Sequence, residues 1–199
     1  MNSFKAIALA MLLSTHVGVA SAADEDGKFA VKGAGKRLCS NFLLASAQKS
    51  TDYYLYGGWL EGYISAYNRF QPQNYDATPW QTTELLLALL QQDCENAKDT
   101  HFLTVTNGLL KALFPIRLSA ESALVVIDVN DAKSYFYVEI LKRAKQRLIK
   151  MDYLNALGSD DFDQETLDAF KHFQRDRGLA QTGVPDQNTL MNLFLKKSG

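Results

Sequence analysis

The sequence predicts a mostly α-helical fold in which two helical domains are joined by a short β-hairpin. Apolar residues recur at helical spacing from residue 36 to 114, residues 125–137 are rich in β-branched and aromatic side chains, and a short motif repeats near the C-terminus. The 47% of hydrophobic residues suits one or two small cores. The chain has 21 Lys and Arg residues and 22 Asp and Glu residues, so it lacks the excess of basic residues that indicates a nucleic-acid partner.

The first 22 residues have the pattern of a secretory signal peptide. Lys5 supplies a positive start, residues 6–13 form an apolar stretch, and Ala20-Ser21-Ala22 is a small-residue cleavage site. The apolar stretch is too short to span a bilayer, although an uncleaved anchor is the alternative. We therefore expect an exported protein, periplasmic or extracellular, that begins at Ala23 and has no membrane partner after cleavage.

The predicted organisation has five segments. They are a signal peptide (1–22), a flexible glycine-rich leader (23–35), a helical domain (36–117), a linking hairpin (118–138) and a C-terminal domain (139–199).

The helical domain is expected to hold four helices. Its first helix carries Leu38, Phe42 and Ala45, and the others are expected near residues 52–70, 79–92 and 97–113. Thr78-Pro79-Trp80-Gln81 reads as a capping box that starts the third helix. The glycines of the second helix, Gly57, Gly58 and Gly62, are interpreted as sites of close helix packing.

Cys39 and Cys94 are the two cysteines. In an oxidising compartment an isolated pair is most simply a disulfide, which here would connect the first predicted helix to the end of the third. The alternative is that Cys39 is a thiol nucleophile served by His101.

Residues 123–138 favour a β-hairpin. The runs 125–129 and 135–137 flank Asn130-Asp131, a turn signal. A continuing helix is the competing interpretation.

Residues 162–194 contain an internal repeat. Asp163-Gln164-Glu165-Thr166-Leu167 returns 23 residues later as Asp186-Gln187-Asn188-Thr189-Leu190. Each Asp is expected to cap a helix. The helices carry apolar residues at helical spacing, namely Leu167, Phe170 and Phe173 in one and Leu190, Leu193 and Phe194 in the other. Gly178 suits a left-handed helix end, after which Leu179 folds back.

At these residues the chain resembles the peptidoglycan-binding domain found in many bacterial cell-wall hydrolases. The matching positions are Thr166, Ala169, Phe173, Gln174, Gly178, Leu179, Thr182, Gly183 and Thr189, preceded by a helix with Leu148 and by Tyr153. The resemblance covers roughly residues 139–195 and implies a three-helix module that binds peptidoglycan without a cofactor. One departure is Asp160-Asp161, where the family has Asp-Gly, so the wall-contacting turn lacks its expected glycine.

Five residues are candidates for contact with peptidoglycan. Tyr153 and Phe162 could stack on the ligand, and Gln174 and Arg177 could donate hydrogen bonds. Asp161, in the altered turn, completes the set. Gln174 could equally hold the Gly178 loop through backbone hydrogen bonds.

Basic residues on the preceding helix form either a solvated face or a surface that attracts the carboxylates of stem peptides. They are Lys142, Arg143, Lys145, Arg147 and Lys150.

No catalytic or metal site is predicted. The sequence lacks zinc, nucleophile-elbow and EF-hand motifs. The acids Asp160, Asp161, Asp163 and Glu165 are explained by helix capping, and His172 is expected to be solvated. Paired carboxylates for glycoside hydrolysis have no selective spacing, so an accessory wall hydrolase stays an alternative to a non-catalytic binder.

The N-terminal domain weakly resembles small secreted helical proteins, namely immunity proteins and periplasmic acid-stress chaperones. This resemblance rests on a Trp-Leu-x-Gly-Tyr helix and paired cysteines after a signal peptide. It implies a protein partner at this domain. An exposed aromatic patch drawn from Trp59, Tyr63, Tyr67 and Trp80 would favour that reading.

Overall fold

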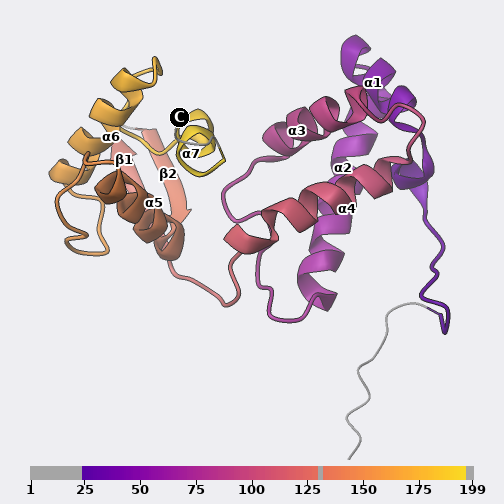
Figure 1. Ribbon diagram of the computed structural model, residues 1–199, viewed down its shortest axis with the longest axis horizontal. Helices are drawn as coiled ribbons and strands as arrows, with labels where there is room; N and C mark the ends of the chain where they lie inside the picture. Colours follow the sequence, from indigo (N-terminus) through magenta and orange to yellow (C-terminus); the bar gives the residue numbers. More distant parts are fainter. Residues whose placement is uncertain (1–23, 130–131, 196–199) are drawn as a thin grey trace, which may run out of the picture. The chain divides into compact units, whose positions relative to one another are not determined.

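A computed structural model of the chain describes residues 24–129 and 132–195 (Figure 1). The predicted signal peptide lies outside these residues. Residues 24–30 form a unit of their own, in which the Asp24 carboxylate accepts hydrogen bonds from the N–H groups of Asp26 and Lys28.

The chain is mostly helical, as the sequence predicts. A short 3₁₀ helix, η1 (Gly33–Lys36), precedes four helices, and a second, η2 (Phe114–Ile116), follows them. The four helices are α1 (Cys39–Gln48), α2 (Thr51–Phe70), α3 (Thr83–Glu95) and α4 (Phe102–Leu113) (Figure 1).

Aromatic rings form the centre of the first hydrophobic core. The rings of Phe42, Tyr56 and Phe102 are fully buried, and their centroids lie 4.8–5.0 Å apart. Leucines of α2, α3 and α4 surround them. Each helix therefore contributes the apolar stripe that its spacing predicts.

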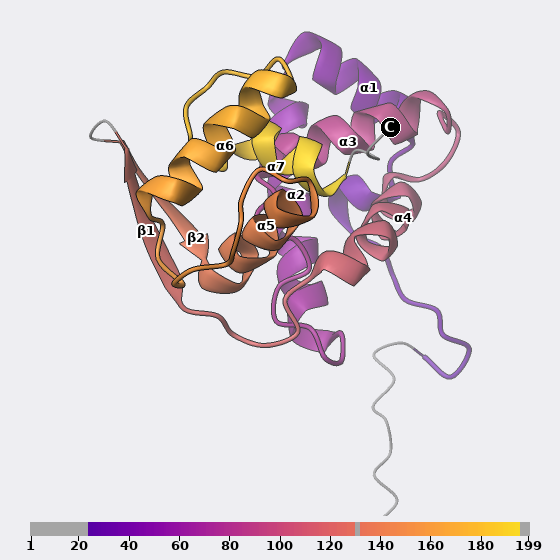
Figure 2. The ribbon, with the colours of Figure 1, turned by 60° about the vertical axis from the view of Figure 1, so that its left-hand side comes forward.

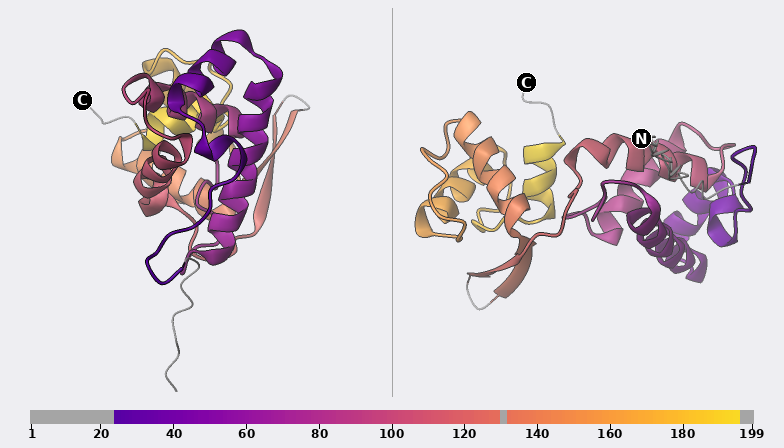
Figure 3. Two further views of the ribbon diagram at one scale, coloured as in Figure 1. Left: turned by 90° about the vertical axis from the view of Figure 1, so that its right-hand side faces the viewer. Right: turned by 90° about the horizontal axis from the view of Figure 1, so that it is seen from below.

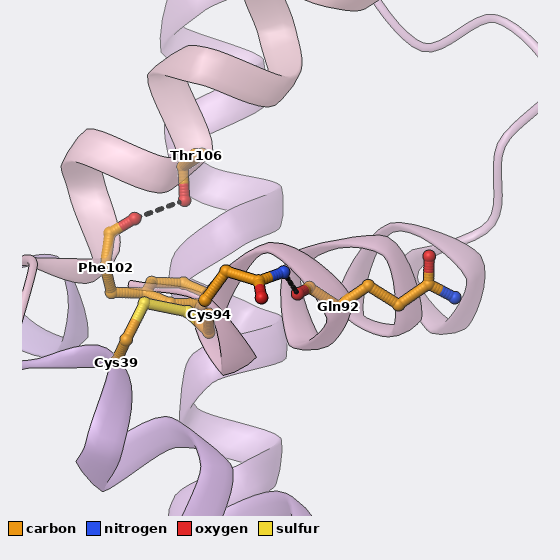
Figure 4. Close-up of a disulfide and its surroundings, with 6 residues drawn as sticks. Cys39, Gln92, Cys94, Phe102 and Thr106 are labelled. Carbon is orange, nitrogen blue, oxygen red and sulfur yellow. Dashed lines mark hydrogen bonds between the residues drawn. A yellow bond between two sulfur atoms is a disulfide. The ribbon is translucent and has the colours of Figure 1, made fainter. Parts of the chain in front are cut away.

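A disulfide links Cys39, at the start of α1, to Cys94, near the end of α3 (Figure 4). Their Cα atoms are 5.1 Å apart, and both residues are fully buried beside Phe102. The predicted pairing is confirmed. Because the sulfur of Cys39 is in this bond, the alternative of a Cys39 nucleophile served by His101 is wrong.

Two of the expected helices begin later than the sequence indicates. α3 begins at Thr83, and its cap is Thr82, whose hydroxyl accepts a hydrogen bond from the Leu85 N–H group. The capping box at residues 78–81 is wrong because Trp80 packs into the second hydrophobic core instead of entering a helix. α4 begins at Phe102, since His101 forms a β-bridge with Leu38.

The glycines of α2 have different surroundings. Gly57 is buried, and a Cβ there would meet Leu87 and Thr83 of α3 at 3.6 and 3.7 Å, so it is a packing site. Gly58 and Gly62 are exposed with open space beside them, and the packing interpretation is wrong for both. Close approach is needed instead at Gly35, where the Trp59 ring leaves no room for a Cβ. Residues 33–36, which overlap the predicted leader, are therefore packed against α2.

The predicted hairpin is confirmed. β1 (Leu124–Val129) pairs antiparallel with β2 (Ala132–Tyr137) (Figure 2). The register places Val126 opposite Tyr135. Ile127 is buried, whereas Val126 and Tyr135 are exposed on the other face. The hairpin thus has one face toward the protein interior and one toward solvent.

Three helices complete the fold: α5 (Val138–Lys150), α6 (Gln164–Asp176) and α7 (Gln187–Phe194) (Figures 2 and 3). The two repeat copies start α6 and α7, as predicted. The carboxylates of Asp163 and Asp186 each accept a hydrogen bond, 2.8 Å long, from the N–H group three residues on. Gly178 ends α6 with a φ of 66°, and the Leu179 N–H group returns to the Gln174 carbonyl.

The second hydrophobic core joins these helices. Leu141, Ala144 and Leu148 of α5 form the predicted stripe, and they pack with Phe170, Phe173, Leu190 and Leu193. Trp80 and Leu118 also belong to this core. No helix in the described parts of the chain is long and apolar enough to cross a membrane.

Candidate functional site

Gln174 is a structural residue of the second core. Its side chain is fully buried, and its amide nitrogen lies 2.9–3.0 Å from the Thr182 and Thr189 hydroxyls and the Val184 carbonyl. Its amide oxygen accepts a hydrogen bond from the Gly183 N–H group at 2.8 Å. Because these bonds use its polar atoms, Gln174 holds the loop between α6 and α7, which is the second of its predicted roles. Contact with a ligand would require this loop to open.

Tyr153 and Arg177 lie together at the C-terminal end of α6. The Tyr153 hydroxyl donates a hydrogen bond to the Asp176 carboxylate at 3.1 Å, and its ring meets the Phe173 ring edge-on. The Arg177 guanidinium carbon is 5.6 Å from the centroid of the same Phe173 ring. Arg177 is exposed and Tyr153 half-buried, so both can be reached by a ligand.

The electrostatics of this end favour an ionised Asp176. The Arg175 guanidinium, followed by the Tyr153 hydroxyl, lowers the pKa of the Asp176 carboxyl. Burial, together with the hydrogen bond to Asp176, raises the pKa of Tyr153. The tyrosine is therefore a neutral donor whose ring edge and hydroxyl are positioned by α6.

Asp161 and Phe162 lie before the other end of α6. Phe162 is half-buried and stacks on Phe170 with the ring centroids 6.1 Å apart. Asp161 has an exposed side chain, and its carbonyl accepts a hydrogen bond from the Lys145 ammonium. The positive φ of this turn occurs at Gly158 (60°), so the turn has its left-handed residue two positions before Asp160-Asp161.

The five candidate residues therefore do not form one cluster. α6 has 13 residues, and at about 1.5 Å of rise per residue its ends are roughly 20 Å apart. Tyr153 and Arg177 lie at one end, Asp161 lies before the other end, and the Phe162 ring stacks on Phe170 near the middle of the helix. Gln174 is in the interior. A polymer could contact both ends, whereas a small ligand could contact only one.

One interpretation of the basic residues of α5 is a uniformly solvated face. The structure does not show such a face. Lys142, Arg147 and Lys150 are exposed. Arg143 is half-buried and bonds the Glu139 carboxylate and two backbone carbonyls. Lys145 is only 2% exposed.

The burial of Lys145 is not among the expectations from the sequence, which place it with the other basic residues of this helix. Its ammonium donates hydrogen bonds to the Ser159 and Asp161 carbonyls at 2.8 and 2.7 Å, and it lines a cavity of about 200 Å³. The signal was present: Lys145 lies four residues after Leu141 and three before Leu148, which is the spacing of the buried stripe.

No metal site is evident where the chain is described: no group of three or more His, Cys, Asp or Glu side chains could hold an ion there. His172 is exposed, as predicted. Asp163 is a helix cap, and hydrogen bonds from the Thr166 hydroxyl and N–H group lower the pKa of its carboxyl.

The exposed aromatic patch that would favour a protein partner of the N-terminal helices does not form. Trp80 is 7% exposed within the second core. Trp59 stacks on Tyr63 and donates its indole N–H to the Lys32 carbonyl, and Tyr63 donates its hydroxyl hydrogen to Asn107. Tyr67 is half-buried. These rings are packing residues, and the observation that would favour a protein partner is missing at this place.

Among known proteins, similarity to this chain is found at its C-terminal helices. No curated protein and no solved structure gives a significant match to the chain. Residues 139–193 match one protein family, which is described as "Putative peptidoglycan binding domain". The match begins in α5 and ends in α7, so it contains the three helices, both Asp caps and the Gln174 loop. The C-terminal part of this chain thus carries a peptidoglycan-binding domain.

Proposed function

We propose that the chain is an exported, non-catalytic protein that binds cell-wall peptidoglycan through residues 139–199 and keeps its N-terminal helices near the wall. The observation that carries the proposal is the family match over α5–α7. A family of this description contributes binding rather than chemistry, which supports a non-enzymatic role.

Two features support export. The buried Cys39–Cys94 disulfide suits an oxidising compartment outside the cytoplasm. Peptidoglycan is itself an extracytoplasmic polymer, so a domain that binds it acts there. The signal-peptide pattern of residues 1–22 agrees with both.

The ligand surface is proposed to include Tyr153, Phe162, Asp161 and Arg177. Arg177 adds an exposed cation beside the partly exposed Tyr153 ring, a combination that suits a sugar ring or a carboxylate. Gln174 is left out of this surface because its amide is engaged in the loop.

Co-sedimentation with purified peptidoglycan sacculi tests the proposal. The chain from Ala23 onward is expected to pellet with sacculi and to release no soluble muropeptides. Arg177→Ala should lower the pelleted fraction, whereas Arg147→Ala, which removes another exposed arginine, should leave it unchanged. Released muropeptides would instead establish the hydrolase alternative. Failure of the unmodified chain to pellet would overturn the wall-binding proposal.

A second candidate function is binding of a protein partner by the N-terminal helices. Leu44, Tyr54 and Leu55 are 58%, 68% and 56% exposed, and Tyr54 lines a groove of about 520 Å³ between α2 and α3. Exposed apolar side chains near a groove favour a partner surface. A photo-crosslinking residue at position 54, compared with one at the exposed Lys111, should then give a defined protein adduct only at position 54 in cells that export the chain.

A further inference from the structure

The Lys145 ammonium is a buried cation without a direct ion pair. Its two recorded hydrogen bonds go to neutral carbonyls, those of Ser159 and Asp161. Across the described residues, no ion pair within 4.0 Å includes Lys145. An ammonium carries three donors, and buried charges in proteins are normally paired. The ammonium therefore keeps a donor without a partner. The Asp163 carboxylate, whose pKa Lys145 helps to lower, acts on this charge from beyond 4.0 Å and forms no ion pair with it.

This cation borders an open cavity. The cavity measures about 200 Å³ and is lined by Lys142, Lys145, Leu157, Gly158, Ser159 and Asp160. A water molecule occupies about 30 Å³ in the liquid, so the cavity has room for several water molecules. The charged end of one amino acid could take their place. It adjoins a larger hollow of about 390 Å³, since Lys142 and Asp160 line both. The hollow leads toward residues 118–123 and gives room for the rest of a chain-like ligand.

The charges at the cavity are of both signs. Lys142 and Lys145 supply two cations, and Asp160 supplies a carboxylate. Glu139, on the wall of the adjoining hollow, is already paired with Arg143 at 2.9 Å. Asp160 would repel a doubly charged phosphate, and no aromatic side chain lines the cavity to stack on a sugar.

We propose that this cavity binds a free amino-acid end of a peptidoglycan stem peptide, with its carboxylate on Lys142 and Lys145 and its ammonium on Asp160. The inference rests on the proposed wall binding, and it assigns the peptide rather than the glycan to this side of the domain. The ligand carboxylate would give Lys145 the direct ion pair that it lacks. Asp160 gives selectivity for a carboxylate that has a neighbouring ammonium.

The test is calorimetric titration of the chain from Ala23 onward with three probes. The first is the tripeptide L-alanyl-γ-D-glutamyl-meso-diaminopimelate, which has a free amino-acid end. The second is the same peptide amidated at that carboxylate, and the third is the disaccharide of N-acetylglucosamine and N-acetylmuramic acid without peptide. The tripeptide is expected to bind more tightly than its amide by at least fivefold.

Variants at exposed residues keep this test separate from folding. In the described structure the exposed side chains of Lys142 and Asp160 form no hydrogen bond and no ion pair, so Lys142→Gln and Asp160→Asn should leave the melting temperature unchanged. Each should weaken tripeptide binding at least fivefold and leave disaccharide binding alone. Lys150→Gln, which removes an exposed lysine of α5 outside the cavity, should change neither affinity.

Each result decides between the cavity assignment and wall binding. Equal affinity for peptide and amide, or equal behaviour of the Lys142 and Lys150 variants, would overturn the cavity assignment. If sacculi still pellet the unmodified chain, wall binding survives that result. If the tripeptide binds in the expected pattern but sacculi do not pellet the chain, the assignment stands and wall anchoring fails. Absence of both kinds of binding overturns both.

Discussion

The two hydrophobic cores of the molecule are stabilised in different ways. The first, around Phe42, Tyr56 and Phe102, is closed by a buried disulfide and by aromatic rings in mutual contact. The second, around Phe170 and Phe173, has no disulfide and instead encloses an amide and an ammonium, those of Gln174 and Lys145.

The difference follows from what each core must hold. The first core packs helices against helices, a task that apolar area can do alone. The second must also position two loops, residues 157–162 and 178–186, whose backbone groups need partners. Gln174 and Lys145 supply these partners. We infer that the need to hold these two loops is the reason for the polar interior of the second core.

The largest effect is expected from removing the disulfide. The Cys39→Ala/Cys94→Ala variant opens a loop whose ends are 55 residues apart, and the chain-entropy account gives a loss of about 4 kcal/mol in the free energy of unfolding. Urea unfolding measures the loss, and hydrogen exchange locates it. Amides of α1–α4 should lose more protection than those of α5–α7. An equal loss in both regions would break the comparison, because it would make the two cores one cooperative unit.

The next largest effect is expected at Gln174. Gln174→Ala leaves its buried partners unsatisfied, and each such group costs about 1–3 kcal/mol before relaxation. Since water can enter part of the loop, we expect a loss of about 3 kcal/mol, with lost amide protection in α6 and α7. Gln181→Ala, in the same loop but exposed, is the control and should cost less than about 0.5 kcal/mol. Similar values for the two variants would show that the buried amide is not what holds the loop.

The smallest loss of stability is expected from removing the helix caps of α6 and α7, two helices of the second core. Asp163→Ala and Asp186→Ala should each cost about 1 kcal/mol near neutral pH, because each carboxylate accepts a 2.8 Å hydrogen bond from the N–H group three residues on. Asp163 also accepts a hydrogen bond from the Thr166 hydroxyl, so its replacement should have the larger effect. The folded pKa of Asp163 is lowered, so the unfolded chain binds more protons than the folded one between the two pKa values. The charge-dependent stabilisation is therefore complete above an unfolded pKa of about 4 and disappears as the pH falls through the folded value.

Urea unfolding of the Asp163 variants between pH 2 and pH 6 measures this dependence. The difference between the unmodified chain and Asp163→Ala should narrow as the pH decreases. Asp163→Asn is the control, since it keeps a capping oxygen without a titrating charge. A constant difference over this range would mean that the charge of Asp163 has no part in the cap.

Sequence reasoning performs best on local signals. The Asp caps, the Gly178 helix end and the β-hairpin each depend on interactions between residues close in sequence. It performs less well where a local signal competes with a distant contact. The capping box before Trp80 is well formed in sequence, but burial of the indole in the second core outweighs it.

The candidate site shows the same limit. Tyr153, Arg177, Asp161 and Phe162 all lie next to α6, as their motif suggests, yet they are spread along its length. The motif leaves two roles open for Gln174, because its burial depends on contacts with Thr182, Val184 and Thr189 of the following loop and helix. The cavity beside Lys145 depends on the turn at Gly158, whose path no local pattern describes.

The sequence by itself determined the helical class, the two capped repeat helices, the hairpin and the cysteine pairing, and its C-terminal motif pointed to peptidoglycan. The helices and the hairpin follow from periodicity and capping chemistry, which act over short distances along the chain. The cysteine pairing follows because two cysteines leave one possible pair. Only the tertiary structure decided that Gln174 and Lys145 are interior, that Trp80 belongs to the second core and that Lys142 and Asp160 share a cavity. Burial is a property of the whole fold, because it depends on which distant segments exclude water from a side chain.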